Sequence, residues 1–298
     1  MQNNAKFSEN IPKVSIILTV YNHEEFIKEA IESVLQQSFL DFELIIINDG
    51  SEDNTRDQIE KYAPNEKIII KNIDHIGRQK ALNLGFKLAR GEYITIIDSD
   101  DIYLQEKIKR QVDYLEIHHN TVLVGTYAKE YDLINDKEYL NMPPLADNKI
   151  RSLLLYEAVL PFPTIMTRRE ILERVGYCNE TIPLKEDFEL IAKIASVGKV
   201  AVIPDFLVII RRHHKNSFIK LDPEVHRKSM LKVRWLNLWR LKPPLNVFIK
   251  MMAWHSFEYL VHLIPESLRH GLPEPLRNFS KQIFPDQKNS HSYKHIYK

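Results

Sequence analysis

The sequence contains few glycines and a single cysteine, and both shortages exclude familiar classes of protein. Only eight of the 298 residues are glycine. No two are separated by one residue and no pair has P-loop spacing before Lys-Ser or Lys-Thr, which excludes a G-x-G dinucleotide fingerprint and a P-loop. The lone Cys178 excludes an internal disulfide framework and a four-cysteine zinc site. We interpret it as a small buried hydrophobe rather than a nucleophile.

Long apolar runs are missing as well. The chain has no stretch of about 18 uncharged apolar residues, so we expect no transmembrane helix. Residues 1–12 are polar, and we expect no signal peptide there. The cysteine content fits a reducing compartment. These features favour a cytoplasmic protein, and we expect no nucleic-acid partner.

The net charge of +1 hides an uneven distribution of charge along the chain. Residues 223–298 contain 13 Lys and Arg against 5 Asp and Glu, whereas residues 1–222 are net negative. All three tryptophans, Trp235, Trp239 and Trp254, lie in the basic part. We therefore predict a main domain over residues 1–222 and a basic, Trp-containing helical extension over residues 223–298.

Strand-like and helix-like segments alternate through the first third of the chain. Apolar, β-branched runs predict strands, and periodically spaced apolar residues predict helices. The expected strands are 14–20, 42–47, 67–71 and 93–97, and the expected helices are 25–37, 53–62 and 78–89. This alternation predicts an α/β fold with a mostly parallel sheet covered by helices on both faces. Ligands of such sheets bind beyond the carboxyl ends of the strands.

The rest of the chain is less regular. We expect helices at 104–118, 169–175 and 185–197, strands within 122–134, an extended segment at 161–167, and two strands, 199–203 and 206–211, joined by Pro204-Asp205. From Pro223 the pattern predicts amphipathic helices broken at Pro243-Pro244, Pro265 and Pro273, with a frayed end from about Pro285.

Three carboxylates directly follow the fourth expected strand, in the run Asp98-Ser99-Asp100-Asp101. Carboxylates this close repel one another unless a cation binds. Oxygen ligands suit Mg²⁺ or Mn²⁺, and Mg²⁺ is typically bound together with substrate phosphates. The alternative is a solvated turn in which Asp100 or Asp101 caps the following helix.

Two longer runs surround these acids: VSIILTVYNHEEFIKEAIESVLQQSFLDFELIIINDGSEDNT and HIGRQKALNLGFKLARGEYITIIDSDD. Together they resemble the start of a family 2 glycosyltransferase of the GT-A fold. The similarity is close over about residues 13–103 and looser through 168–180 and 185–190. The resemblance implies a Rossmann-like GT-A domain, with a nucleotide-binding half at 13–103 and an acceptor half at 104–222.

The resemblance also implies a nucleotide-sugar site. The matching positions are Thr19, Tyr21, Asn22, Glu24, Asp49, Gly50, Ser51, Arg78, Asp98, Ser99 and Asp100. Asp98 and Asp100 form the D-x-D element that implies Mn²⁺ or Mg²⁺ as cofactor, whereas Thr19 stands where Pro is usual. Asp49 matches an acid that accepts a base N–H, which suits uracil. For Asp49 the alternative is an Asx turn, and for Arg78 a solvated helix start.

Glu186-Asp187 matches the E-D pair of the family, whose Asp is the catalytic base. A helix N-terminus keeps such a carboxylate anionic, although acids are also ordinary there. The resemblance assigns Glu186 to acceptor contact or support, and we place Arg212 in the same role. Arg212 belongs to the run Arg211-Arg212-His213-His214, which can neutralise a diphosphate and add a His to the metal. A loop of solvated charges is the alternative.

These features predict an inverting transfer of a sugar from a nucleotide-diphosphate donor, most favourably a UDP-sugar, to a hydroxyl of a glycan or lipid-linked acceptor. The resemblance places this reaction in bacterial cell-surface polysaccharide synthesis. A sugar nucleotidyltransferase and a catalytically idle nucleotide-sugar-binding protein are the alternatives. Two interpretations of the basic extension stay open, and one of them is peripheral contact with the inner face of the plasma membrane. The alternative is packing on the catalytic domain or on a second subunit of a homodimer.

Overall fold

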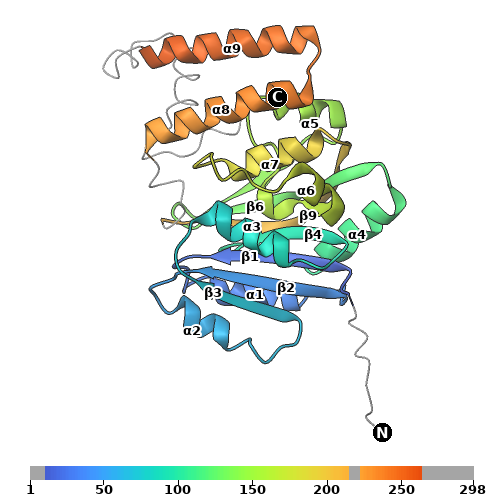
Figure 1. Ribbon diagram of the computed structural model, residues 1–298, viewed down its shortest axis with the longest axis vertical. Coiled ribbons are helices and arrows are strands. Elements are labelled where there is room, and N and C mark those ends of the chain that lie inside the picture. Colours follow the sequence, from blue (N-terminus) through green and yellow to red (C-terminus); the bar gives the residue numbers. More distant parts are fainter. Residues whose placement is uncertain (1–10, 215–221, 264–298) are drawn as a thin grey trace. The chain divides into compact units, whose positions relative to one another are not determined.

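The computed structural model describes residues 11–214 and 222–263, which fall into two compact units (Figure 1). The first unit comprises residues 11–214 and 222–242, and the second comprises residues 243–263. In chain order the elements of the first unit are β1 (Val14–Val20), α1 (Ile27–Leu35), β2 (Phe42–Asp49), α2 (Thr55–Glu60), β3 (Ile68–Ile73), α3 (Arg78–Leu88), β4 (Tyr93–Asp98), β5 (Ile102–Tyr103), α4 (Lys107–Ile117), β6 (Thr121–Asp132), β7 (Lys137–Asn141), α5 (Asp147–Leu153), the 3₁₀ turn η1 (Phe162–Thr164), β8 (Met166–Arg168), α6 (Arg169–Val175), α7 (Glu186–Ala195), β9 (Lys199–Arg212) and α8 (Pro223–Leu241). The second unit contributes α9 (Leu245–Leu263).

One sheet forms the centre of the first unit. Its strand order is β3-β2-β1-β4-β8-β6-β9-β5, and β7 pairs with β6 outside this path. Strands β3, β2, β1 and β4 are parallel to one another, as the alternation of strands and helices predicts. Beyond them β8 runs antiparallel to both β4 and β6, while β6 and β9 are parallel. The predicted α/β class is confirmed.

The strands of the parallel part are buried on both faces because their side chains alternate between two hydrophobic clusters. Ile17 of β1 belongs to one cluster, with residues of α3, α5, α6, α7 and α8. Ile16 and Leu18 belong to the other, with residues of α1, α2 and α4. This period of two explains why each strand is a continuous apolar run in the sequence. Figure 1 shows the two helical layers on either side of the sheet.

The sequence correctly places most elements of the first unit, with one clear error. It predicts two strands joined by Pro204-Asp205, but the structure has the single strand β9 across both residues. Ile203 pairs with Thr126 and Phe206 with the next residue of β6, so Pro204 and Asp205 form a bulge. A bulge tolerates proline because the extra residues need no ladder hydrogen bond. The sequence does not predict β5, β7 and α5. These elements are too short for their apolar residues to show a helical or strand period.

The C-terminal helices follow the expected breaks. Asp222 caps α8 by accepting the backbone N–H of Glu224 at 2.8 Å, and α8 ends before Pro243 and Pro244 as predicted. The predicted breaks at Pro265 and Pro273 and the frayed end from Pro285 lie outside the described residues. Among the helices of the described ranges, none combines the length and the apolar content needed to cross a membrane.

A buried polar network fixes the strands on both sides of residues 98–101. Lys107 of α4 is fully buried, and its Nζ donates to Thr95 Oγ1 at 2.9 Å and to Gln111 Oε1 at 2.8 Å. The same Nζ lies 3.9 Å from the centre of the Tyr103 ring, whose hydroxyl donates to the backbone of β4. Burial lowers the pKa of Lys107 well below its ordinary value. Strands β4 and β5 are therefore held together where the acidic run begins and ends.

Candidate active site

The carboxyl ends of β1, β2 and β4 lie side by side at one edge of the sheet. Thr19 of β1 pairs in register with Ile47 of β2 and with Asp98 of β4. Each of these strands is followed by a loop that carries predicted site residues, and the loop between β3 and α3 joins them. The parallel register alone therefore gathers most of the predicted nucleotide-sugar residues at one edge.

The loops after β1 and β2 hold each other. Asn22 Oδ1 accepts the N–H of Glu52 at 2.8 Å, and the Asn22 N–H donates to Ser51 Oγ at 3.0 Å. The Glu24 carboxylate accepts the backbone and side-chain N–H groups of Asn54 at 3.0 and 2.7 Å. Asn22 has a φ of 56°, a left-handed value that Asn tolerates better than most residues. These predicted ligands shape the two loops, and their contact with a donor stays a prediction.

Gly50 lets the loop after β2 pack closely against the loop before α3. Its φ is +75°, and a Cβ at this position would lie 2.6 Å from the backbone N of His75. Only glycine meets both demands. Beside it the rings of Tyr21 and His75 lie 4.3 Å apart at an interplanar angle of 31°, and Tyr21 is 40% exposed. An open aromatic surface of this kind can stack against a flat ligand.

The Asp49 carboxylate is buried and already accepts hydrogen bonds. Its Oδ1 accepts the Ile76 N–H at 2.7 Å and its Oδ2 the Gly77 N–H at 3.0 Å, while His75 Nδ1 lies 3.1 Å from Oδ2. A carboxylate has about four acceptor positions. Asp49 therefore shapes the loop before Arg78 and can still accept a further N–H, so the base contact stays a prediction.

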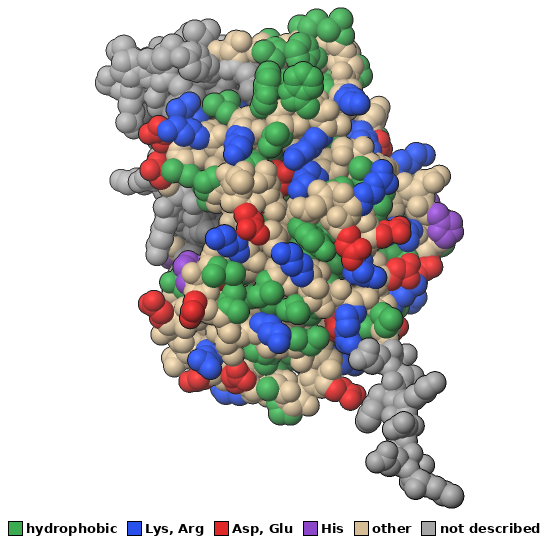
Figure 2. All heavy atoms as spheres, viewed as in Figure 1, with side chains coloured by type: hydrophobic (Ala, Val, Ile, Leu, Met, Phe, Trp, Pro, Cys, Tyr) green, Lys and Arg blue, Asp and Glu red, His purple; other side chains and the backbone are tan. Residues whose placement is uncertain are grey.

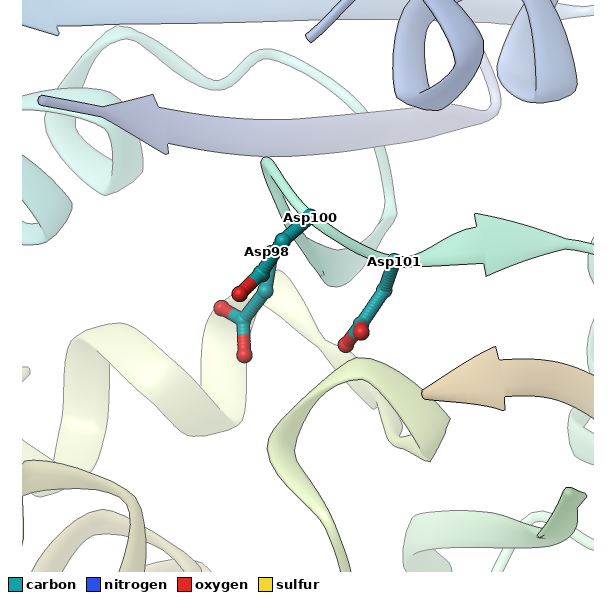
Figure 3. Close-up of side chains that lie close together, drawn as sticks. All are labelled: Asp98, Asp100 and Asp101. Carbon is teal, nitrogen blue, oxygen red and sulfur yellow. The ribbon is translucent and has the colours of Figure 1, made fainter. Parts of the chain in front are cut away.

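Three carboxyl groups converge after β4. Figure 3 shows Asp98, Asp100 and Asp101 pointing to the same side of the loop. One oxygen atom from each lies within 4.8 Å of the others, and such a group can hold a metal ion. Ser99 lies between them in sequence, and its Oγ is 2.6 Å from His23 Nδ1. The predicted D-x-D element is thus a true cluster in space.

Burial and mutual repulsion perturb these acids. Burial raises the pKa of Asp98 above its ordinary value despite the nearby Arg78, and it raises that of Asp101 well above. For Asp100 burial acts in the same direction, but the hydrogen bond to His213 and the charge of His23 leave its pKa below the ordinary value. A bound cation would stabilise the ionised form of these carboxylates, because its charge offsets both their desolvation and their mutual repulsion.

The end of β9 returns to the acidic cluster. His213 Nε2 lies 3.0 Å from Asp100 Oδ2, and the His213 ring stacks on Phe26 with ring centres 4.1 Å apart. The backbone N–H of Arg211 donates to the Asp101 carboxylate at 3.1 Å, and the Arg211 guanidinium contacts the Asp100 carbonyl. The imidazole nitrogen of His213 therefore lies beside the predicted metal ligands, where it can serve as a further ligand.

Arg212, the member of the basic run that the sequence favours, contacts the neighbouring strand, and its acceptor or support role stays a prediction. Its guanidinium pairs with Glu130 of the neighbouring strand β6. Successive residues of a strand point to opposite faces, so Arg211 and not Arg212 faces the cluster. His23 and His75 are the site contacts that the sequence missed, and Arg211 is predicted only as a member of the basic run. The basic run was the signal for Arg211, whereas single histidines in loops carry none.

Arg78 joins the acidic cluster to α7. Its NH2 lies 2.5 Å from Asp98 Oδ1, and its Nε lies 2.8 Å from Glu186 Oε1. Burial alone would lower the pKa of Arg78, but the two carboxylates raise it above its ordinary value. For Glu186 burial acts in the other direction and raises the pKa, and the charge of Arg78 partly offsets this rise. One guanidinium therefore links residues that lie far apart in the sequence.

The first turn of α7 presents the predicted base. Lys185 precedes the helix with a φ of 74°, a strained value for a residue with a side chain, and Glu186 and Asp187 follow. Asp187 Oδ1 accepts the N–H of Phe188 at 2.7 Å. The charge of Asp187 raises the pKa of both Asp98 and Glu186, so these carboxylates lie near one another.

Asn83 and Cys178 have structural contacts. The Asn83 side chain donates to the Cys178 carbonyl at 3.0 Å and accepts the Cys178 N–H at 2.9 Å. Cys178 is 4% exposed, and burial raises the pKa of its thiol. The prediction of a buried cysteine is confirmed, and a thiol kept protonated is a poor nucleophile.

A doubly covered sheet with an acidic cluster at its carboxyl edge is the architecture of GT-A glycosyltransferases. Residues 15–176 match the model of glycosyl transferase family 2. An uncharacterized glycosyltransferase of Haemophilus influenzae is 31% identical over 86% of this chain and 82% of its own length. WfaP of Escherichia coli, a UDP-Glc:alpha-D-GlcNAc-diphosphoundecaprenol beta-1,3-glucosyltransferase, is 33% identical over 68% of this chain and 78% of its own length. The chain therefore belongs to glycosyl transferase family 2.

Other relatives are longer, and the chain spans 35% of the length of an uncharacterized glycosyltransferase of Rickettsia conorii, to which it is 32% identical over 70% of its own length. Among solved structures, S. aureus TarS in complex with UDP superposes with a TM-score of 0.67 at 19% identity, covering 92% of this chain and 80% of TarS. The mannosyltransferase PcManGT of Pyrobaculum calidifontis, in complex with GDP-Man and Mn²⁺, has a TM-score of 0.56 at 15% identity, covering 92% and 84%. These structures confirm the predicted GT-A fold.

Proposed function

We propose that the protein transfers a sugar from a UDP-sugar to a hydroxyl of a glycan or lipid-linked acceptor, with inversion at the anomeric carbon. The observation that carries this proposal is the Arg78 guanidinium, which contacts both Asp98 of the acidic cluster and Glu186 beside Asp187. A donor diphosphate near the cluster would thus lie close to a carboxylate that can activate an acceptor.

The relatives support the choice of substrates. WfaP by its name uses UDP-Glc and a GlcNAc-diphosphoundecaprenol acceptor, and TarS has been solved with UDP-GlcNAc. In this chain Tyr21 and His75 offer a surface for the base, and the Asp49 carboxylate would accept an imide N–H such as that of uracil in addition to those of Ile76 and Gly77. We place the reaction in bacterial cell-surface polysaccharide synthesis.

The acidic cluster fits a hard divalent cation, Mn²⁺ or Mg²⁺, because its donors are carboxylate oxygens. Asp98 and Asp100 would hold the ion, with His213 beside Asp100 as a further donor, while Asp101 is engaged by the backbone of Arg211. When bound, such an ion supplies positive charge that stabilises the diphosphate leaving group. The Mn²⁺ complex of PcManGT supports this assignment.

Asp187 would serve as the general base. Its carboxylate accepts the proton of the acceptor hydroxyl while the hydroxyl oxygen forms a bond to the anomeric carbon. The bond from that carbon to the donor phosphate oxygen breaks, and UDP leaves with the electron pair. Glu186, held by Arg78 at 2.8 Å, would orient the acceptor rather than take its proton.

The test incubates the protein with a panel of UDP-, GDP- and ADP-sugars, with and without Mn²⁺. The acceptors are either bacterial lipids extracted with chloroform or isolated glycans. We expect nucleotide release and sugar incorporation from a UDP-sugar only, and only with the metal. Calorimetry should show tighter binding of UDP than of GDP or ADP, and Asp49→Asn should weaken it. A purine preference, or transfer that is indifferent to Mn²⁺, would overturn the proposal.

A further inference from the structure

Helix α8 buries polar residues and exposes its largest apolar ones. Ser229 and Asn237 on the inner face are 3% and 0% exposed, whereas Trp235 and Trp239 on the outer face are 57% and 66% exposed. The two indole rings contact each other edge to face with centres 6.1 Å apart. Large exposed aromatic residues are the informative exception to the usual rule of burial, and they mark interaction surfaces.

The orientation of α8 is fixed by specific contacts of its inner face. Asn237 donates to the Leu154 carbonyl at 3.0 Å, Arg234 donates to the Tyr156 carbonyl at 2.8 Å, and Arg240 pairs with Glu189 of α7 at 2.7 Å. Rolling the helix to bury the tryptophans would break all three contacts. The exposed tryptophans therefore do not result from a loosely attached helix.

The outer face is a regular stripe of apolar and cationic residues, which we call the Trp stripe: Lys228, Leu231, Lys232, Trp235 and Trp239. Their spacing places them on one side of the helix. Leu231 is 39% exposed and both lysines are exposed. Lys228 is paired to Glu224 at 2.6 Å, and Lys232 Nζ donates to the Thr181 carbonyl at 3.1 Å, so both cations are held at the surface by neighbouring groups. On the face seen in Figure 2, acidic and basic side chains mix over the sheet, whereas basic ones predominate over α8.

We propose that the Trp stripe of α8 docks the protein on an anionic lipid bilayer. Tryptophan favours the boundary between headgroups and acyl chains, and lysines beside it are attracted by anionic headgroups. A second copy of the chain is a poorer occupant, because a symmetric contact through this stripe would bring its lysines against those of the partner. The proposal goes beyond the transfer reaction and does not depend on it.

The test uses the full chain without donor or metal, with vesicles of phosphatidylcholine alone or mixed with phosphatidylglycerol. We expect sedimentation with the anionic vesicles only, weakening with salt, and a blue shift of the tryptophan emission. Trp235→Ser with Trp239→Ser should lower the partition coefficient by at least about tenfold, since both side chains leave water on binding. Lys232→Gln should lower it by about fivefold.

The matched controls are exposed residues elsewhere in the first unit. Ile117 and Leu40 are 74% and 68% exposed, so Leu40→Ser with Ile117→Ser removes equivalent apolar surface, and Lys109→Gln removes an exposed cation from α4. These variants should bind vesicles like the wild type, and melting curves verify that all variants fold.

The proposal is overturned if the wild type does not bind anionic vesicles or if the tryptophan variant binds them equally well. It is also overturned if the stripe instead mediates a dimer that the tryptophan substitutions dissociate. Because no donor is present, none of these results bears on the transfer reaction.

Discussion

The two halves of the sheet position their functional side chains in different ways. In the parallel half, functional side chains lie at or directly after the end of the strand that places them, as Asp49 ends β2 and Asp98 ends β4. In the mixed half, Glu186 and Asp187 lie on a helix, and His213 directly follows the long strand β9. The carboxyl edge of the parallel strands, which we propose as the donor edge, is therefore built from local motifs. Glu186, Asp187 and His213 reach the site only through long-range packing.

From the proposed function we expect the parallel edge and helix α7 to have separate tasks. Substitutions at the donor edge should change donor affinity, and substitutions on α7 should change the rate of transfer at saturating donor. Arg78 contacts both sides, so it should affect both quantities. A substitution on one side that changes the quantity expected of the other side would contradict this division.

Asp100→Ala should have the largest effect. Removing this carboxylate takes away a proposed metal ligand and the partner of His213, so transfer and Mn²⁺-dependent UDP binding should both be lost. The melting temperature should change little, because the remaining acids repel each other less. Calorimetry of UDP with and without Mn²⁺ checks this, with Asp113→Ala, which removes an exposed carboxylate of α4, as control. Metal dependence equal to that of the wild type would exclude Asp100 from the metal site.

Arg78→Gln should lower both donor affinity and turnover. Hydrogen bonds to charged groups contribute about 1.5–3 kcal/mol each, so kcat/KM should fall by about ten- to a hundredfold. Losing the cation should also raise the pKa of Asp98 and Glu186 further, since Arg78 now lowers both. Ionised carboxylates would then require a higher pH, and the acid limb of the activity profile should shift toward alkaline pH.

The control for this variant is Arg110→Gln, which breaks an exposed ion pair with Asp205 and should leave the profile unchanged. An effect of Arg78→Gln on donor affinity alone would show that Arg78 serves only donor binding. The contact of Arg78 with Glu186 of α7 would then have no part in turnover.

Gly50→Ala should have a smaller effect, confined to the donor edge. The left-handed φ and the approach of His75 N to 2.6 Å predict a loss of stability of about 1–3 kcal/mol and weaker UDP binding, with turnover at saturating donor retained. Gly77→Ala is the matched control, because its φ is +90° but nothing lies within 4 Å of an added Cβ. Equal effects of the two substitutions would show that backbone strain, and not the close approach, accounts for the loss.

The same contrast explains how much the sequence revealed. The strands and loops of the parallel half could be predicted because apolar runs and the acids that follow them are local signals, and β1 begins and ends where expected. The position of Arg211 beside Asp100 could not, because it depends on the register of β9 after the bulge at Pro204 and Asp205. The bridge from Asp98 through Arg78 to Glu186 likewise depends on packing between distant segments.

The assignment of Asp187 as the base is tested by comparing Asp187→Asn with Glu186→Gln. The rate of sugar transfer and the dissociation constant of the UDP-sugar are measured for each variant. Asparagine keeps the shape and can still accept the Phe188 N–H, but it cannot take the acceptor proton. Transfer should fall by about 10²–10⁴-fold in Asp187→Asn and by less in Glu186→Gln, while donor affinity in Asp187→Asn stays near that of the wild type. Near-normal transfer by Asp187→Asn, or loss of its donor binding, would contradict the assignment of Asp187 as the base.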